Sequence, residues 1–406
     1  MINEGNGIFR PTWIEIDLGA ISHNFDVIQK RLRPETQILI PVKADAYGHG
    51  ACEVARMLEA KGAAFFGVAT VDEAVILRKS GIRTPLLILN AILEEEADAV
   101  LEYNLTQTVC TEESARQLDA RAKRWKKKIP VHLKVDTGMG RIGVWYEEAH
   151  TFARFVKECR NLLTEGLYTH LANADDAEPD VTLLQISRFQ EVVGELKKEN
   201  LLPPFVHLAN SAATLKYPSS HFNLVRPGLA IYGIDPFYEN GRGPSFGLRP
   251  ALKLLTRIVY LKKTPPGRRI SYGGTYVTPE ETVIGTLPIG YADGYNRLLS
   301  NRATVLVRGR HLPVCGRICM DQTMIDAGNS PSLSPGEEVV IIGRQGSEEI
   351  RVEKLSTLCS TIPYEFICRL SNRIPRLYLN PQDASLPPAP ILSVKQGIDK
   401  AAPSSV

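Results

Sequence analysis

The pattern of apolar and polar positions predicts a strand and a helix near the amino terminus, then a repeating series of strands and helices, and finally a series of short strands. Residues 12–18 alternate apolar with acidic positions, which is the pattern of a strand with one solvated face. The next segment carries an apolar stripe at helical spacing, formed by Ile21, Phe25, Ile28 and Leu32. From there the chain takes up a regular rhythm of short apolar runs and helical patterns.

Eight short apolar runs in this rhythm are predicted strands. They lie at about 38–43, 65–69, 85–90, 105–110, 130–135, 165–171, 205–209 and 223–226. Eight βα units over this length predict a (β/α)₈ TIM-like barrel, an α/β fold whose chemistry lies at the C-terminal strand ends. A doubly wound open sheet is the alternative, but it needs no eighth strand and would not gather residues from every strand end at one mouth.

The rhythm stops after about residue 240, where the runs become short, β-branched or alternating and are separated by Gly and Pro. They predict a C-terminal all-β domain with strands at 251–262, 267–272, 282–288, 303–308, 311–319, 322–327 and 338–342. The strand at 12–18 has no place in the barrel and is expected to join this domain. The predicted division is therefore 1–18 with the β domain, 19–240 as barrel, 241–380 as β domain and 381–406 as a flexible tail.

Composition narrows the class of protein. The 406 residues are 44% hydrophobic and 23% charged with a net charge of +3, which fits a globular protein and argues against a nucleic-acid partner. No apolar run approaches the roughly 20 residues that span a bilayer, and the amino terminus lacks a signal peptide's pattern, so we expect a cytoplasmic protein without membrane contact. Seven scattered cysteines indicate free thiols, and Cys315 and Cys319 have no second ligand pair, so no metal is expected.

Lys43 is the first candidate for chemistry, because it stands at the end of the buried run 38–43. Burial removes hydration from an ammonium, lowers its pKa and makes a lysine a competent nucleophile or Schiff-base former. The alternative is a lysine that merely extends its amine into solvent from a strand end. The basic run 121–128 is interpreted as a solvated helix end rather than a phosphate site.

Further candidates follow the other predicted strands, at what would be the same mouth of the barrel. They are Tyr47, Arg141 in Asp136-Thr-Gly-Met-Gly-Arg141, His170, Ser211 in His207-Leu-Ala-Asn-Ser211, and Arg226-Pro-Gly228. Barrels frequently bind phosphate with the loops after strands seven and eight, where Ser211 offers a hydroxyl and Gly228 an open backbone amide. A lysine opposite such a cradle is the arrangement expected of a pyridoxal phosphate enzyme.

Several motifs of the chain, in order, resemble those of alanine racemases, the pyridoxal phosphate-dependent family of fold type III. They are Val42-Lys43-Ala-Asp45-Ala-Tyr47-Gly-His-Gly, Lys134-Val-Asp-Thr-Gly-Met-Gly-Arg141, Arg226-Pro-Gly, Ser271-Tyr272-Gly-Gly274, Pro288-Ile-Gly-Tyr291-Ala-Asp-Gly, Gly316-Arg-Ile-Cys-Met320-Asp and Ile362-Pro-Tyr364-Glu. The resemblance covers roughly residues 10–380. It implies an isomerase that interconverts L- and D-alanine by two-base proton transfer at Cα and supplies D-alanine for cell-wall peptidoglycan.

The resemblance also implies a role for each site residue. Lys43 would hold the cofactor as an internal aldimine and act as one base, and Tyr272 would be the other base, contributed by the β domain of the second subunit of a homodimer. Arg226 would contact the pyridine nitrogen, with His170 beside it. The phosphate ligands would be Tyr47, Ser211, Gly228, Leu229 and Tyr364. Arg141 and the Met320 backbone would receive the substrate carboxylate, and Lys134 matches a position that is carbamylated in many members.

Some questions stay open at this level. Racemisation of serine or another small amino acid is an alternative activity, and a non-catalytic pyridoxal phosphate-binding barrel is another, although that would need neither Tyr272 nor a β domain. A related barrel decarboxylase would protonate Cα from one face only. Two positions depart from the family pattern: Asp45 replaces the usual Asn and Gly274 the usual Ala. The effect of Asp45 on Lys43, the role of the tail and the stability of the dimer are not fixed by the sequence.

Overall fold

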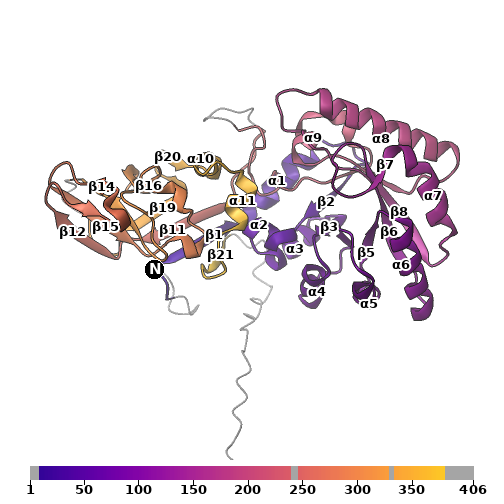
Figure 1. Cartoon of the computed structure of the whole chain (residues 1–406), viewed down its shortest axis with the longest axis horizontal. Helices are drawn as coiled ribbons and strands as arrows, with labels where there is room; N and C mark the ends of the chain where they lie inside the picture. The colour runs from indigo at the N-terminus through magenta and orange to yellow at the C-terminus, as the bar shows by residue number, and fades with distance from the viewer. Residues whose placement is uncertain (1–8, 239–245, 329–332, 380–406) are drawn as a thin grey trace, which may run out of the picture.

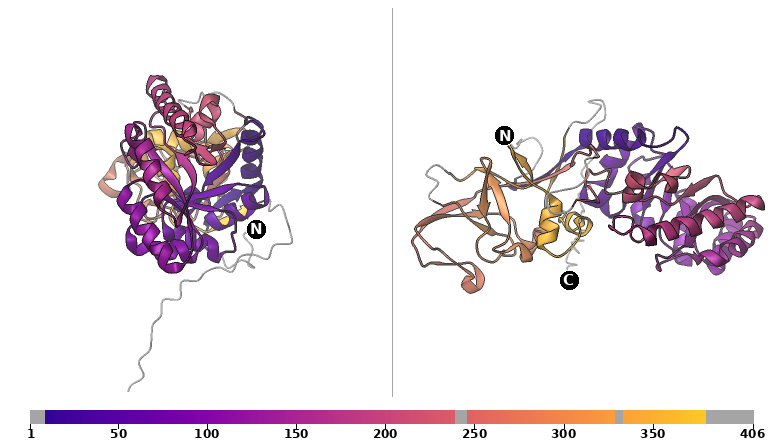
Figure 2. Two further views of the ribbon diagram at one scale, coloured as in Figure 1. Left: turned by 90° about the vertical axis from the view of Figure 1, so that its right-hand side faces the viewer. Right: turned by 90° about the horizontal axis from the view of Figure 1, so that it is seen from above.

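The computed structural model describes residues 9–238, 246–328 and 333–379. The predicted tail, 381–406, lies outside them. Figure 1 shows a barrel ringed by helices at one end of the long axis and a β-rich domain at the other, and Figure 2 shows the same division from above. The predicted fold class is confirmed.

The barrel is a closed ring of parallel strands. In the described part of the chain their order is β5-β4-β3-β2-β10-β9-β8-β6, and β6 closes the ring by pairing with β5. These strands are β2 (Gln37–Pro41), β3 (Phe65–Val68), β4 (Leu86–Ile88), β5 (Thr106–Val109), β6 (Ile129–Asp136), β8 (Leu162–Tyr168), β9 (Phe205–His207) and β10 (Leu224–Val225). Each lies within or close to a predicted run. A short strand, β7 (Val144–Trp145), pairs in parallel with the last two residues of β6.

Helices cover the outside of the ring. They are α1 (Leu18–Gln29), α3 (Ala51–Ala60), α4 (Val71–Lys79), α5 (Ala97–Glu102), α6 (Glu112–Trp125), α7 (Ala149–Glu158), α8 (Asp180–Lys198) and α9 (Ser211–Lys216). Short polar side chains start several of them: Asp17 accepts from the backbone N–H of Ala20, and Thr70 and Glu73 form a capping box. Leu32 lies beyond the end of α1, so the predicted apolar stripe is one turn too long.

The β domain contains a seven-stranded sheet in which the two ends of the described chain meet. β1 (Thr12–Asp17) pairs antiparallel with β11 (Leu252–Arg257) and parallel with β21 (Arg376–Leu379). The strand at 12–18 therefore joins the β domain, while the exact domain boundaries stay a prediction. The other strands of this sheet are β16 (Thr304–Val307), β17 (Arg310–Pro313), β19 (Glu338–Gln345) and β20 (Glu348–Ile350).

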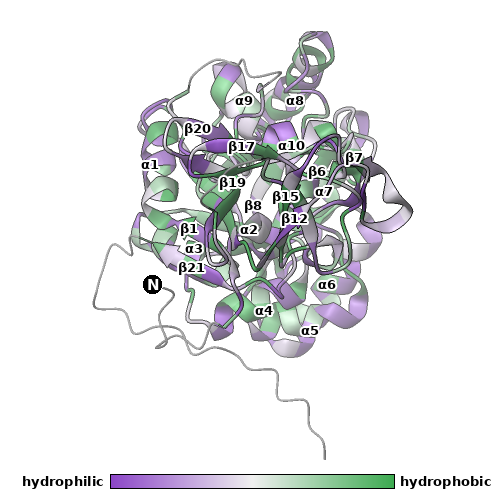
Figure 3. Cartoon of the chain, turned by 90° about the vertical axis from the view of Figure 1, so that its left-hand side faces the viewer, coloured by the Kyte–Doolittle hydropathy of each residue, from purple (hydrophilic) through white to green (hydrophobic). Residues whose placement is uncertain are grey.

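Two smaller sheets complete the domain. One consists of β12 (Tyr260–Thr264), β15 (Thr282–Leu287) and β18 (Thr323–Asp326), and the other of β13 (Arg269–Ile270) and β14 (Tyr276–Val277). The single strand predicted at 251–262 is wrong, because the chain leaves the large sheet after Arg257 and enters the three-stranded sheet at Tyr260. Seen from the β-domain end, the strands stand in front of the peripheral barrel helices (Figure 3).

Two helices that the apolar pattern did not predict lie near the junction of the domains. They are α10 (Val352–Leu358) and α11 (Pro363–Cys368). α11 packs against the segment Lys43–Gly48 at the barrel mouth. Figure 1 shows α11 between the β domain and the barrel. This packing brings a late part of the sequence to the candidate site.

Candidate active site

Strand alternation fills the barrel with polar side chains toward its C-terminal end. In β6 the side chains of Val131, Leu133 and Val135 belong to the apolar core that packs outside the ring. A small separate apolar cluster consists of Leu39, Phe65, Leu87 and Leu224. The ring of His132 contacts the ring of Phe65 in this cluster edge-on. Because strand side chains alternate, His132, Lys134 and Asp136 share the opposite face of β6, toward the interior.

Lys43 lies at the barrel mouth, two residues beyond the end of β2. The predicted strand 38–43 is therefore too long, since β2 ends at Pro41. Lys43 is half-buried, and burial lowers its pKa, as do the positive charges of Arg141 and Arg226, while Glu73 opposes the shift. An amine in this setting loses its proton more readily than an exposed lysine does, which suits a nucleophile or a base.

The segment after Lys43 is a left-handed turn. Ala44, Asp45, Ala46 and Tyr47 all have φ between 52° and 54°. This conformation costs an L-residue roughly 1–2 kcal/mol, so four in succession require strong support from their surroundings. One support is Glu73, whose carboxylate accepts from the N–H of Ala44 at 2.7 Å and from that of Ala69 at 2.6 Å. The turn carries Tyr47 back over the mouth.

The predicted phosphate ligands gather beside this turn. The rings of Tyr47 and Tyr364 are 5.7 Å apart, and a Cβ on Gly228 would lie only 2.8 Å from the Tyr47 hydroxyl oxygen. Glycine therefore leaves room for that hydroxyl and keeps the backbone open. Ser211 begins α9, and its hydroxyl oxygen accepts from the N–H of Ala230, one residue after Leu229, at 3.2 Å. Burial raises the pKa of Tyr364 to about 12, so its hydroxyl stays a donor at neutral pH.

Arg226 is 4% exposed, yet no carboxylate lies within ion-pair distance of it in the described part of the chain. Its guanidinium donates to the carbonyl oxygens of Thr169 at 2.7 Å and Leu208 at 3.1 Å, and it contacts His207 Nδ1 at 2.7 Å. It also contacts His170 Nδ1 at 3.2 Å. Burial lowers the pKa of Arg226 to about 10, which still leaves it charged at neutral pH.

The histidines around Arg226 are held neutral. Burial and then the charge of Arg226 lower the pKa of both His170 and His207 well below the usual value. His207 also contacts His132 through a 2.8 Å nitrogen–nitrogen hydrogen bond. An arginine that keeps its proton can donate to an uncharged nitrogen acceptor, such as an unprotonated pyridine nitrogen.

Lys134 is 3% exposed, and its amine has no hydrogen-bond partner among the described residues. It lies over the ring of Tyr168, 4.6 Å from the centroid. Burial and then Arg226 lower its pKa well below the usual value, while nearby Asp136 opposes the shift. Asp136 itself shapes the next loop by accepting from the backbone N–H groups of Gly138, Met139 and Arg141. This loop places Arg141 at the rim of the mouth.

Tyr272 and Met320 lie apart from this group, on the β domain. Their side chains are 70% and 53% exposed. The Met320 backbone is firmly placed, because its carbonyl oxygen accepts from the N–H of Ala292 at 3.0 Å and a Cβ on Gly290 would lie 2.3 Å from that oxygen. The single chain thus brings Tyr364 and the predicted barrel residues together, but it does not bring Tyr272 and Met320 to them.

Two residues with structural importance at the site were missed by sequence reasoning. Glu73 supports the left-handed turn, although its spacing from Thr70 signals only a helix cap. Arg376 binds the other end of the turn by donating to the Gly48 carbonyl oxygen at 3.2 Å. No local pattern marks it, because its partner is 328 positions away.

A closed parallel barrel with such a mouth, followed by a β domain that presents an exposed tyrosine, defines a two-domain barrel enzyme. Family models bear this out: that of the alanine racemase N-terminal domain matches residues 16–236, and that of the C-terminal domain matches residues 251–378. The chain belongs to the alanine racemase family.

Individual relatives agree with this assignment. The alanine racemase of Carboxydothermus hydrogenoformans is 45% identical over 370 residues, which cover 91% of this chain and 100% of that protein. The crystal structure of alanine racemase from D-cycloserine-producing Streptomyces lavendulae matches with a TM-score of 0.87 at 35% identity, covering 92% and 98% of the two chains. The Bartonella henselae enzyme, solved with covalently bound pyridoxal phosphate, matches with a TM-score of 0.81 at 29% identity, covering 91% and 99%.

Proposed function

We propose that this protein racemises alanine with pyridoxal 5′-phosphate held on Lys43, and that two copies of the chain form each active site. The observation that carries the proposal is that half-buried Lys43 begins the turn that carries Tyr47, whose hydroxyl oxygen would lie 2.8 Å from a Cβ on Gly228. The resulting D-alanine would serve cell-wall peptidoglycan, as the family membership suggests.

The mouth suits the cofactor in three ways. Lys43 offers an amine whose pKa is lowered. Arg226 offers a guanidinium that has no carboxylate partner in the described structure. Hydroxyl and amide donors for a phosphate would come from Tyr47, Ser211, Gly228, Leu229 and Tyr364. When bound, pyridoxal phosphate would withdraw electrons from the substrate Cα and so make its proton acidic. Arg226 would retain its own proton and donate to the ring nitrogen.

Racemisation requires a proton to leave one face of Cα and return to the other, so the chain must supply two bases on opposite faces. Lys43, freed from the cofactor when substrate binds, would be one of them. Tyr272 would be the other. Its side chain is 70% exposed on the β domain, which is consistent with service in a second copy of the chain. His170 beside Arg226 would face that tyrosine in the dimer.

The substrate carboxylate would be received by Arg141 and by the backbone at Met320. Lys134 supports the orientation of Arg141 in this proposal. Burial lowers the pKa of its amine and so favours the unprotonated form, which would add CO₂ through a new N–C bond and release one proton, leaving an anionic carbamate near Arg141. The added oxygens would also provide hydrogen-bond partners at a place where the amine has none in the described structure.

No helix in the described ranges is long and apolar enough to cross a bilayer. We propose a cytoplasmic homodimer that acts on a small amino acid and contacts neither membrane nor nucleic acid. Family membership supports the small amino-acid substrate, and the exposed apolar side chains of Tyr272, Tyr291 and Met320 on one domain support the dimer.

Deuterium exchange at Cα tests the function. The protein is incubated in D₂O with pyridoxal phosphate and either L- or D-alanine, and both exchange and the appearance of the other enantiomer are followed by NMR and chiral chromatography. Wild type should exchange and interconvert both enantiomers. Lys43→Ala should lose both, whereas Tyr272→Phe should lose mainly exchange from L-alanine. Tyr260→Phe, which alters another exposed tyrosine of the β domain, is the matched control.

If the cofactor binds to Lys43 but the Cα proton of alanine does not exchange, the proposed reaction is overturned. Parallel reactions with serine decide the substrate, because one hydroxyl or methyl group changes discrimination by only about 1–3 kcal/mol. If serine is racemised faster than alanine, serine is the main substrate, and the proposed two-base reaction still holds.

A further inference from the structure

The left-handed turn Ala44–Tyr47 needs support at both ends, since ordinary residues rarely adopt this conformation. Glu73 holds the N-terminal end through the N–H of Ala44. At the C-terminal end the carbonyl oxygen of Gly48 accepts from Nε of Arg376 at 3.2 Å. The anchor at this end therefore comes from β21, the last strand of the described chain.

The same guanidinium binds the loop that follows α11. Its Nη2 donates to the carbonyl oxygen of Leu370 at 3.0 Å, and its Nη1 donates to those of Ser371 at 3.1 Å and Ile374 at 2.9 Å. Arg376 thus makes four hydrogen bonds, all to backbone carbonyl oxygens, from one planar fork. A lysine has a single flexible amine and cannot reproduce this geometry.

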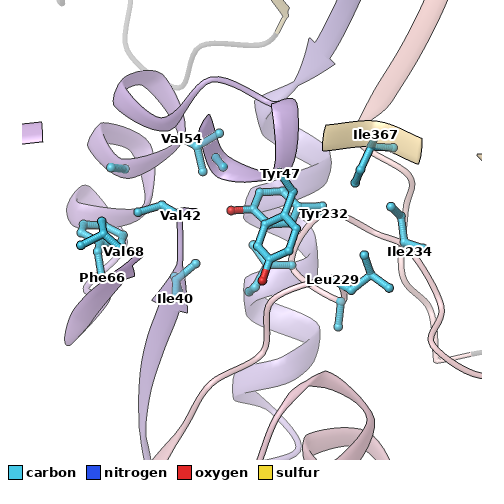
Figure 4. Close-up of a cluster of buried hydrophobic side chains, with 14 of the residues drawn as sticks. Ile40, Val42, Tyr47, Val54, Phe66, Val68, Leu229, Tyr232, Ile234 and Ile367 are labelled. Atoms are coloured by element: carbon cyan, nitrogen blue, oxygen red, sulfur yellow. The ribbon is translucent and has the colours of Figure 1, made fainter. Parts of the chain in front are cut away.

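The two segments joined by Arg376 each carry a tyrosine of the proposed phosphate cradle. Tyr47 lies on the turn, and Tyr364 lies on α11. The segments also touch directly, because a Cβ on Gly48 would lie 2.7 Å from the carbonyl oxygen of Ile367. Figure 4 shows Tyr47 beside Tyr232, with Ile367 nearby. A shift of either segment would change the separation of the two tyrosine hydroxyls.

We propose that Arg376 is a positioning residue for the cofactor phosphate, which holds the Tyr47 turn and the α11 segment at a fixed separation. This inference rests on the proposed function, in which Tyr47 and Tyr364 bind that phosphate. Asp45 and Tyr378 are the charged or titratable groups that act on the guanidinium, and both favour its charged form. Arg376 itself does not touch the proposed reacting atoms.

Cofactor affinity, rather than turnover alone, tests the inference. Apoenzyme is titrated with pyridoxal phosphate, and the dissociation constant and release rate are followed by the absorbance of the lysine-linked complex. Arg376→Gln should weaken binding roughly tenfold or more, given the hydrogen bonds to a charged group that are lost. Arg376→Lys should be intermediate. At saturating cofactor the KM for alanine should change far less than the cofactor affinity.

Arg369→Gln is the matched control, because Arg369 follows α11 directly but forms an exposed ion pair with Glu365. Its cofactor affinity should equal that of wild type. Thermal unfolding of each apoprotein shows whether a variant folds. If Arg376→Gln does not fold, the comparison of Arg376→Lys with wild type decides the question.

A mutant cycle tests the route through the tyrosines. Arg376→Gln should weaken binding much less in the Tyr47→Phe/Tyr364→Phe background than in wild type, because the groups that it positions are already gone. Equal losses in both backgrounds, or unchanged affinity in folded Arg376→Gln, would overturn the inference. A wild type that forms no lysine-linked complex would overturn the proposed function and this inference with it, whereas the comparison of variants overturns the inference alone.

Discussion

The Asp45 carboxylate accepts a hydrogen bond from the backbone N–H of Ala51 at 2.7 Å, at the start of α3. An anion at a helix N-terminus interacts favourably with the helix dipole. The groups that chiefly shift the pKa of Lys43 are Arg141, Glu73, Cys368 and Arg226, and Asp45 is not one of them. This departure from the family pattern therefore acts chiefly on the start of α3 and on Arg376.

Asp45→Asn should accordingly leave the catalytic pH profile almost unchanged. The amide oxygen of Asn can still accept from Ala51, so only the charge is lost, and stability should fall by about 0.3–1 kcal/mol. Urea unfolding and the pH dependence of kcat/KM measure the two effects. A displacement of the profile by a full pH unit would show that Asp45 does act on Lys43.

Glu73→Gln should behave differently, because the Glu73 carboxylate raises the pKa of Lys43. Glutamine retains an acceptor for the N–H of Ala44, but it removes the negative charge and the second acceptor, which binds the N–H of Ala69. The pKa of Lys43 should therefore fall further, and the pH midpoint for reaction of the apoenzyme with pyridoxal phosphate should move to lower pH. A midpoint that does not move, or that rises, would contradict this.

Mixing two inactive variants tests whether each site is shared between subunits. Lys43→Ala and Tyr272→Phe dimers, unfolded together and refolded, should regain activity, because a mixed dimer contains one site with both native residues. Random pairing makes half of the dimers mixed, so activity should reach roughly a quarter of wild type. No recovery, with exchange of subunits verified by mass spectrometry, would place Lys43 and Tyr272 in the same chain's site.

Buried Lys134 should make apoprotein stability depend on pH. The pKa of its amine is lower in the folded protein than in the unfolded chain. At a pH between these two pKa values the unfolded chain binds more protons than the folded protein, so the free energy of unfolding rises with pH. A fully linked group contributes about 1.4 kcal/mol per pH unit. In CO₂-free buffer, Lys134→Met should be more stable at pH 7 and should gain less stability toward pH 10. An unchanged pH slope would show that the amine is not buried in the apoprotein.

Two glycines with similar φ angles should differ in their tolerance of a side chain. Gly50 has φ of 91°, and a Cβ there would lie 1.8 Å from the Tyr378 hydroxyl oxygen, whereas Gly62 has φ of 89° and an open surrounding. Gly62→Ala should cost about 1–2 kcal/mol from conformation alone. Gly50→Ala should cost more in chemical unfolding, and Tyr378→Phe should restore part of the difference. Equal costs would mean that Tyr378 moves aside freely.

The fold was largely readable from the sequence because parallel barrel strands are buried on both faces and so form continuous apolar runs. The β domain was read less well. At Ile258 and Val259 the apolar character continues while the chain changes sheets, so the pattern gave no break. α11 is only six residues long and begins with Pro363, which leaves too little periodicity to reveal a helix.

The candidate site divides along similar lines. Lys43, Arg141 and Arg226 follow predicted strands, and strand order alone brings them to one mouth. The left-handed turn is different, since Ala44 and Ala46 carry no signal for positive φ, Asp45 carries only a weak one, and tertiary contacts impose the conformation. Arg376 was missed for the same reason, because its partners are defined by packing between distant segments.

The position of β1 between β11 and β21 also bears on how the protein is made. On the ribosome β1 is made before both of its partner strands. One of its edges stays unpaired until residues 252–257 are synthesised, and the other stays unpaired until residues 376–379 are synthesised, where Arg376 pairs with Ile14. A nascent chain that stops short of β21 would expose a strand edge and would at the same time lack Arg376, which anchors the turn Ala44–Tyr47. Capture of the cofactor would then distinguish finished chains from unfinished ones.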